Sequence, residues 1–258
     1  MSATDVTLAD ALGRLATTPR LLVALDFDGT LAPEVDRPME ARALPEANEA
    51  IRRLVALDQT TVALVSGRDL AALDEITEVP ESVMLVGSHG IEMRVDGHET
   101  SLTEAELELR ARIHREMEAG VGDAEGVWIE EKPAGFALHT RLADEATTER
   151  VLTAVDGAVG SLEGVTTRRG KNILEYAVRA TGKNDGVERL REIVGATAVL
   201  FAGDDVTDED AFRVLQDGDI GVKVGSGDTA ATHRVADAAE MARVLGDLAD
   251  LRDHLGHS

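Results

Sequence analysis

Short runs of consecutive apolar residues alternate with amphipathic stretches along this chain. Four such runs are present, at residues 21–25, 61–65, 83–86 and 197–201. Runs of this length, each followed closely by polar residues or glycine, are typical of parallel strands covered on both faces. Residues 44–57 and 238–255 carry apolar side chains at helical spacing. The pattern therefore predicts an α/β fold with a parallel sheet.

The middle of the chain has a different pattern. Residues 126–142 and 165–178 are predicted as longer strands, because polar and apolar residues are interleaved as in an antiparallel sheet with one exposed face. Two helices are predicted beside them, at residues 102–117 and 144–159. The first of these helices opens with Thr103 and Glu106, whose spacing is that of a capping box.

These two patterns predict two domains. Residues 1–94 and 178–258 are expected to form a Rossmann-like parallel-sheet core, and residues 95–177 an inserted α+β cap domain. Gly97 and residues 180–182 are the expected hinges, because no low-complexity linker separates the two parts.

The composition excludes several kinds of protein. Cysteine is absent, so disulfide frameworks, thiolate metal sites and thiol catalysis are excluded. Only 2% of the residues are aromatic and the formal net charge is −23, which argues against nucleic acid as a partner. No apolar run approaches the ~20 residues that span a bilayer, and no signal-peptide pattern opens the chain. We therefore expect a cytoplasmic protein that has no membrane partner.

The excess of acidic residues predicts the salt conditions in which the protein works. The chain has 49 acidic and 26 basic residues, and only four of the basic residues are lysines. A net charge this large opposes compaction at low salt, and molar salt, with a Debye length of ~3 Å, screens it. We favour a halophilic protein, and an acidic protein from a GC-rich genome is the alternative.

Two carboxylates follow the first apolar run. Asp26 and Asp28 stand at the end of the strand predicted at 21–25, where open α/β sheets place their sites. Gly29 permits an immediate turn that brings both carboxylates to the same edge of the sheet. The alternative is an Asx-type turn without a chemical role.

A second group of carboxylates follows the run at 197–201. Gly203 is followed by Asp204 and Asp205, with Asp208 three residues further on. Like charges repel and raise one another's pKa, and a hard divalent cation such as Mg²⁺ removes that conflict. The alternative is a solvated helix N-terminus in an acid-rich protein.

Anion-binding residues stand at two further places. Ser66, Gly67 and Arg68 follow the strand predicted at 61–65, and Lys183 precedes a predicted helix. Hydroxyl, backbone N–H and cationic groups of this kind can hold a phosphate. Each residue alone carries little information, because a serine after a strand is more often a cap.

Together and in this order, the four segments resemble the haloacid dehalogenase superfamily of phosphatases. DFDGTL at 26–31 matches the first motif, Ser66 the second, Lys183 the third and GDDVTDED at 203–210 the fourth. The resemblance implies that Asp26 is the nucleophile, which forms an aspartyl-phosphate.

The same resemblance implies roles for the other motif residues. Asp28 would be the general acid and then the general base. Mg²⁺ would lie on Asp26, the backbone carbonyl of Asp28 and Asp204, with Asp205 and Asp208 nearby. Ser66, Gly67 and Lys183 would hold the phosphoryl oxygens.

A second resemblance concerns the substrate. Residues 87–90, 130–141, 169–175 and 203–212 look like segments of the trehalose-6-phosphate phosphatase family, in which the cap grips the sugar. The candidate substrate contacts are Arg68, His89, Glu131, Lys132, His139, Arg141, Lys171 and Glu175. The implied reaction is Mg²⁺-dependent hydrolysis of trehalose 6-phosphate to trehalose and phosphate.

Two departures from that family leave the exact sugar open. Residues 176–179 lack the usual basic and proline residues, and Asn184 replaces a common glycine. Sucrose 6-phosphate or a glycosyl-glycerate phosphate is the alternative substrate. A sugar-phosphate-binding regulatory module is the non-enzymatic alternative, and the joint presence of all the motif residues argues against it.

Overall fold

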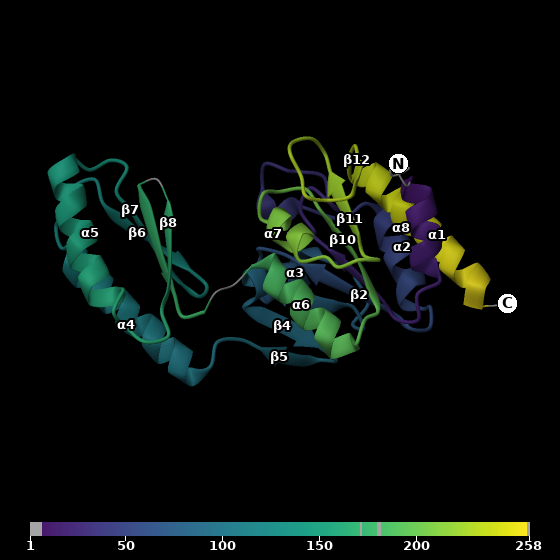
Figure 1. Cartoon of the computed structure of the whole chain (residues 1–258), viewed down its shortest axis with the longest axis horizontal. Coiled ribbons are helices and arrows are strands. Elements are labelled where there is room, and N and C mark those ends of the chain that lie inside the picture. Colours follow the sequence, from purple (N-terminus) through teal and green to yellow (C-terminus); the bar gives the residue numbers. More distant parts are fainter. Residues whose placement is uncertain (1–6, 171, 180–181, 257–258) are drawn as a thin grey trace. The chain divides into compact units, whose positions relative to one another are not determined.

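The computed structural model describes residues 7–170, 172–179 and 182–256, and it contains two compact units (Figure 1). Met1–Thr100 and Gly182–Ser258 form the first unit, and Ser101–Thr181 forms the second. The second unit is therefore an insertion in the first. The expected boundaries lie a few residues earlier in the chain, because β4 (Glu92–Val95) and β5 (His98–Thr100) belong to the sheet of the first unit.

The sheet of the first unit has eight strands in the order β12-β11-β10-β1-β2-β3-β4-β5. Its parallel strands are β1 (Leu21–Leu25), β2 (Thr60–Val65), β3 (Met84–Gly87), β10 (Ala198–Gly203), β11 (Ile220–Val224) and β12 (His233–Val235). The last two strands of the order, β4 and β5, are antiparallel. After β1, the chain adds β2 to β5 on one side of β1 and later adds β10 to β12 on its other side. Ligands of open α/β sheets bind at the carboxyl ends of strands where the order reverses in this way.

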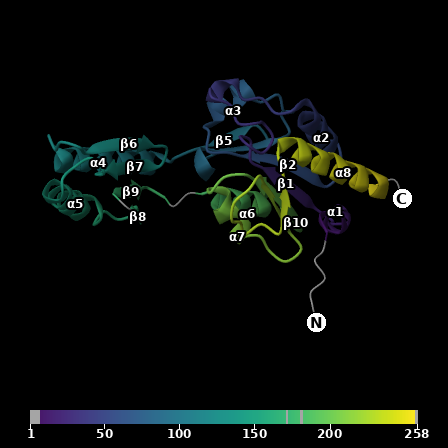
Figure 2. The same cartoon turned by 90° about the horizontal axis from the view of Figure 1, so that it is seen from above.

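Helices cover both faces of this sheet (Figure 2). The helices are α1 (Leu8–Ala16), α2 (Pro45–Val55), α3 (Leu70–Ile76), α6 (Lys183–Val194), α7 (Asp208–Arg213) and α8 (Ala238–Gly256), with short 3₁₀ turns at Pro38–Glu40 and Ser88–Gly90. Leu21, Val23 and Leu25 pack with α1, α2, α3 and α8, whereas Leu22 and Ala24 pack with α6 and α7. Alternate residues of β1 thus enter two different cores, which explains its continuously apolar sequence. Among the described residues, no helix combines the length and apolar character needed to cross a membrane.

The second unit is a four-stranded antiparallel sheet with two helices. Its elements are α4 (Glu104–Val121), β6 (Trp128–Lys132), β7 (Gly135–His139), α5 (Glu145–Val159), β8 (Thr166–Gly170) and β9 (Ile173–Ala177), with strand order β6-β7-β9-β8. Phe136 and Leu138 of β7 and Leu174 and Tyr176 of β9 are buried on one face. The ring of Phe136 stacks on His114 of α4, so this is the face that the helices cover. Residues of the opposite parity lie on the other face.

Two expectations about the connections are wrong. Each long strand expected in the middle of the chain is a hairpin of two shorter strands. Pro133 lies in the first turn and has no N–H for a ladder, and Asn172 in the second turn has a φ of 61°. Asp96 and Gly97 have φ values of 49° and 75°, as a tight hairpin turn requires, so Gly97 joins β4 to β5 and is not a hinge. Residues 180–181 of the other expected hinge lie outside the described residues.

The capping box predicted at the start of α4 is present, and it has a second function. Thr103 and Glu106 exchange their hydrogen bonds as the motif requires. Glu106 also accepts two hydrogen bonds from Arg179, one of them from Nε at 2.6 Å. The Arg179 guanidinium and the Thr103 backbone hold the pKa of Glu106 at about 2. The segments that enter and leave the second unit are therefore joined by an ion pair.

Arg252 connects α8 to the amino-terminal edge of the core sheet. Its buried guanidinium donates to Thr60 Oγ1 (2.6 Å) and to the carbonyl oxygens of Ala16 (3.0 Å), Thr18 (2.9 Å) and Gln59 (2.9 Å). We expect Arg252→Met to lower the free energy of unfolding by about 2–4 kcal/mol, because these acceptors lose their donors. Urea unfolding followed by circular dichroism measures the change. Arg53→Met is the control, because its ion pair with Asp250 is exposed and its loss is expected to cost about 1 kcal/mol at most.

Candidate active site

Three carboxylates meet at the carboxyl ends of β1 and β10. Asp26 follows β1, Asp204 follows β10 and Asp208 begins α7. One ligand atom from each lies within 4.8 Å of the other two. Asp26 and Asp208 are buried and Asp204 is half-buried. Carboxylate oxygens at this spacing are suitable ligands for a hard divalent cation.

Two glycines leave room for these carboxylates. A Cβ on Gly29 would lie 2.1 Å from Oδ2 of Asp204, and a Cβ on Gly203 would lie 2.2 Å from Cγ of Asp208. Gly29 also has a φ of +73°, which side chains disfavour. Both glycines stand in the motifs that sequence analysis singled out, and the structure explains why a larger residue does not fit there.

Lys183, the first residue of α6, lies among the carboxylates. Its buried Nζ donates to Oδ1 of Asp26 and to Oδ1 of Asp208, both at 2.7 Å. Burial raises the pKa of Asp26 to about 8, Lys183 opposes that rise and Asp208 adds to it. Burial disfavours the charged amine, but the two carboxylates outweigh it and raise the pKa of Lys183. The positive charge of one lysine does not balance three carboxylates, so the cluster can accept further positive charge.

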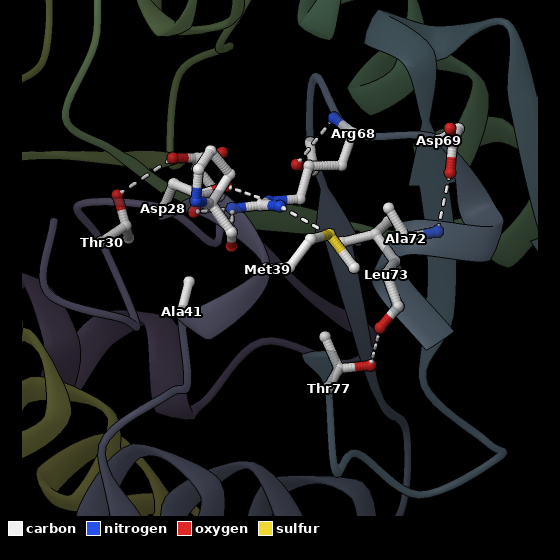
Figure 3. Close-up of polar contacts among 12 residues, drawn as sticks. Asp28, Thr30, Met39, Ala41, Arg68, Asp69, Ala72, Leu73 and Thr77 are labelled. Atoms are coloured by element: carbon white, nitrogen blue, oxygen red, sulfur yellow. Dashed lines mark hydrogen bonds and ion pairs between the residues drawn. The ribbon is translucent and has the colours of Figure 1, made fainter. Parts of the chain in front are cut away.

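Asp28 pairs with Arg68 (Figure 3) and is not one of the three carboxylates of the acidic cluster. Nε of Arg68 donates to Oδ2 of Asp28 and Nη2 donates to Oδ1, each at 2.6 Å. Nη2 also donates to the carbonyl oxygen of Pro38 at 2.7 Å. The hydrogen bonds to Asp28 raise the pKa of Arg68. Arg68, which was expected to contact substrate, is therefore held on the carboxylate expected to act as acid and base.

Ser66, Gly67 and His89 lie together at the end of β2. Ser66 is buried, and its Oγ accepts a hydrogen bond from the N–H of Arg68 at 3.1 Å. A Cβ on Gly67 would lie 2.7 Å from Cε1 and Nε2 of His89, so the imidazole rests against this glycine. Ser88 and His89 both have left-handed backbones, with φ values of 51° and 54°. Their N–H groups donate to the carbonyl oxygens of Arg68 (2.7 Å) and Ser66 (3.1 Å), which hold the turn in place.

Asp205 lies apart from the other expected metal ligands. Its side chain is exposed, and Oδ1 accepts a hydrogen bond from the N–H of Val206 at 2.6 Å. The backbone N–H of Asp205 donates to Oδ2 of Asp208 at 2.9 Å. Asp205 thus contributes its backbone to the cluster rather than its carboxylate.

In the second unit, polar side chains gather on the face of the sheet opposite the helices. Lys132, His139 and Glu175 share that face, as the strand register requires. Glu130 joins them, with its carboxylate 2.9 Å from Nζ of Lys132 and 2.7 Å from Nε2 of His139. Ala137 lies between Glu130 and Glu175 in the register, so a small side chain separates the two carboxylates.

Glu131 lies on the opposite face and was expected to contact substrate. It pairs with Arg110 of α4 at 2.7 Å, and its register partner is the buried Phe136. Glu130 is the carboxylate that sequence reasoning missed. The sequence could have identified it, because side chains alternate between the two faces of a strand. Glu130 is two residues from Lys132 and shares its face, whereas the adjacent Glu131 lies on the other face.

Trp128 was also missed, and it is the only tryptophan in the chain. Its indole stacks on the ring of His139, with centroids 4.6 Å apart and planes 4° from parallel. The guanidinium carbon of Arg141 lies 5.0 Å from the centroid of the Trp128 ring. Arg141 is therefore held on an aromatic surface beside the polar face. Lys171, the remaining expected contact, lies outside the described residues.

Comparisons with known proteins identify the family. The family model for trehalose-phosphatase matches residues 24–241. The bifunctional trehalose-6-phosphate synthase/phosphatase of Thermoproteus tenax is 34% identical over 238 residues, which are 90% of this chain and 32% of that protein. The trehalose-phosphate phosphatase of Mycobacterium marinum is 32% identical over 272 residues, which are 96% of this chain and 68% of that protein.

A solved structure agrees with these matches. That of Aspergillus fumigatus trehalose-6-phosphate phosphatase, in crystal form 3, superposes with a TM-score of 0.79 at 26% identity, covering 95% of this chain and 97% of that one. This chain spans only about a third of the length of the Thermoproteus relative (32%). The family model nevertheless covers both compact units and every motif of the candidate site. The chain therefore belongs to the trehalose-phosphatase family.

Proposed function

We propose that this chain is a Mg²⁺-dependent phosphatase that hydrolyses trehalose 6-phosphate to trehalose and phosphate. The observation that carries the proposal is the position of Asp26, a buried carboxylate held by Lys183 where the strand order reverses. A carboxylate can attack a dianionic phosphoryl group only where positive charge offsets their repulsion. Relatives named as trehalose-phosphate phosphatases support the substrate.

The proposed reaction has two steps. In the first, an Oδ atom of Asp26 bonds to phosphorus and the bond from phosphorus to the sugar oxygen breaks, while protonated Asp28 gives its proton to that oxygen. In the second, water attacks phosphorus, Asp28 takes the proton from water, and the bond to Asp26 breaks to release phosphate. Arg68 holds both carboxylate oxygens of Asp28, and a phosphoryl group competes with Asp28 for that guanidinium. Substrate entry would therefore release Asp28 for its role as an acid.

The acidic cluster fits the cation. Asp26, Asp204 and Asp208 supply carboxylate oxygens, and Gly29 and Gly203 keep their space free. When bound there, Mg²⁺ supplies positive charge that stabilises the phosphoryl group as it is transferred. Lys183 provides further positive charge from the protein itself and holds Asp26 in place.

We further propose that the polar face of the second unit binds the sugar, through Glu130, Lys132, His139 and Glu175. Glu130→Gln is expected to raise KM for trehalose 6-phosphate by ~10-fold with little change in kcat, because a charged hydrogen-bond acceptor for the sugar is lost while the residues that act on the phosphoryl group are unchanged. Steady-state phosphate release measures both constants. Glu131→Gln is the matched comparison on the helix-covered face, and a larger effect there than at Glu130 would contradict this placement.

Another sugar phosphate is the main alternative substrate. Phosphate release from trehalose 6-phosphate, sucrose 6-phosphate and a glycosyl-glycerate phosphate, measured with MgCl₂ and with EDTA, separates the possibilities. We expect the highest kcat/KM with trehalose 6-phosphate and no release with EDTA. Equal rates across the panel would overturn the substrate, and an absence of metal-dependent release from all of them would favour a binding module.

The acidity of the chain supports a salt-loaded cytoplasm as its surroundings. With 49 acidic and 26 basic residues, the folded chain is destabilised by self-repulsion at low salt. We expect the urea midpoint of unfolding to rise continuously as KCl increases toward molar concentrations, where screening is nearly complete. A midpoint that does not depend on KCl would favour the explanation from genome composition.

A further inference from the structure

Lys223 is the one lysine that neither the motifs nor the proposed reaction uses. It lies on β11 beside Gly203 of β10, and only 4% of it is exposed. Its Nζ donates to the backbone carbonyl oxygen of Asp204 and lies 3.8 Å from Oε1 of Glu209. Burying a charged amine costs free energy unless the amine is paired and hydrogen-bonded. The burial of Lys223 next to Asp204 therefore needs an explanation.

The peptide group between Asp204 and Asp205 supplies that explanation. Its N–H end donates to Oδ2 of Asp208 at 2.9 Å, and its C=O end accepts from Lys223. Both ends of one peptide plane are therefore fixed by charged side chains. Fixing this plane restrains the backbone of Asp204, from which its carboxylate projects.

The two buried lysines occupy different parts of one network. Lys183 contacts the carboxylates directly, through Asp26 and Asp208. Lys223 instead donates to the backbone of Asp204, and within the described part of the chain its ion-pair partner is Glu209. Oε2 of Glu209 accepts from the N–H of Ala230 at 2.7 Å, whereas its buried Oε1 has no hydrogen-bond partner. Glu209 therefore balances the charge of Lys223 without contacting the cluster.

We propose that Lys223 is a positioning residue for the cation site, because it fixes the peptide that sets the Asp204 carboxylate. The proposal rests on the proposed function insofar as that function places a divalent cation on Asp26, Asp204 and Asp208. Side chains that orient metal ligands typically change metal affinity by about 10- to 100-fold when they are replaced.

The test compares Mg²⁺ binding in three forms of the full chain. Lys223→Met alone leaves the buried Glu209 carboxylate without a counter-charge, so the double variant Lys223→Met with Glu209→Gln removes both charges together. Glu209→Gln alone is the matched control, because it retains the Lys223 donor. Isothermal titration with MgCl₂ in high KCl measures affinity, and thermal melting reports whether each form is folded.

We expect the folded double variant to bind Mg²⁺ about 10- to 100-fold more weakly than the parent chain, and Glu209→Gln to bind nearly as well as the parent. Equal affinity in the double variant would overturn the proposal, as would an equal loss in Glu209→Gln. A double variant that does not fold would assign Lys223 to stability and overturn the proposal as well. A parent chain that binds Mg²⁺ but releases no phosphate contradicts the proposed function alone, whereas a parent that binds no Mg²⁺ overturns both.

Discussion

Asp26→Asn is expected to reduce phosphate release from trehalose 6-phosphate by at least ~10⁴-fold, with the fold retained. The amide nitrogen and oxygen of asparagine cannot form the phosphorylated intermediate that the proposed reaction requires. Asparagine has nearly the same shape as aspartate and fits the buried site. The measurement is single-turnover phosphate release in high KCl with MgCl₂, together with circular dichroism.

Asp69→Asn is the matched control for this variant. Asp69 caps α3 by accepting a hydrogen bond from the N–H of Ala72 at 2.7 Å, and asparagine caps a helix equally well. It follows Arg68 in the chain (Figure 3) and is not one of the three carboxylates of the acidic cluster. Activity that persists in Asp26→Asn while Asp69→Asn behaves as the parent would mean that a different residue is the nucleophile.

The parts of the site that follow from local sequence were predictable. β1 occupies the residues predicted for it, Leu21–Leu25, because burial on both faces demands a continuous apolar run that ends at the first carboxylate. The capping box of α4 was predictable for a similar reason, since its hydrogen bonds join residues three positions apart. Parallel strands place their carboxyl ends together, so the proximity of Asp26 and Asp204 followed from the same pattern.

The parts that depend on distant residues were not predictable. The bidentate pair of Asp28 and Arg68 joins residues 40 positions apart, and nothing in either segment indicates it. The peptide contact of Lys223 depends on the register between β10 and β11, which neither strand determines alone. The choice of Glu131 is a different kind of miss, because it followed a family segment that contains both glutamates, whereas alternation along the strand already places Glu130 on the face of Lys132, as the register shows.

Lys183→Met is expected to remove both activity and much of the stability of the metal-free protein. Asp26 and Asp208 are buried, and each lies 2.7 Å from the Lys183 amine. Removing one partner of a buried ion pair costs about 3–5 kcal/mol, because the remaining charge has lost its compensation. We therefore expect the free energy of unfolding to fall by that amount in EDTA, as measured by urea unfolding.

MgCl₂ should restore part of the stability of Lys183→Met, because an ion that binds only the folded chain stabilises it by mass action. Arg213→Met is the control, since it removes an exposed pair with Asp210 whose side chains are 60% and 49% accessible, and such pairs contribute about 1 kcal/mol at most. Equal losses in the two variants would contradict the buried-pair explanation. A large loss in Lys183→Met that MgCl₂ does not reduce would instead contradict the placement of the cation among the same carboxylates, because restoring positive charge there should stabilise the fold.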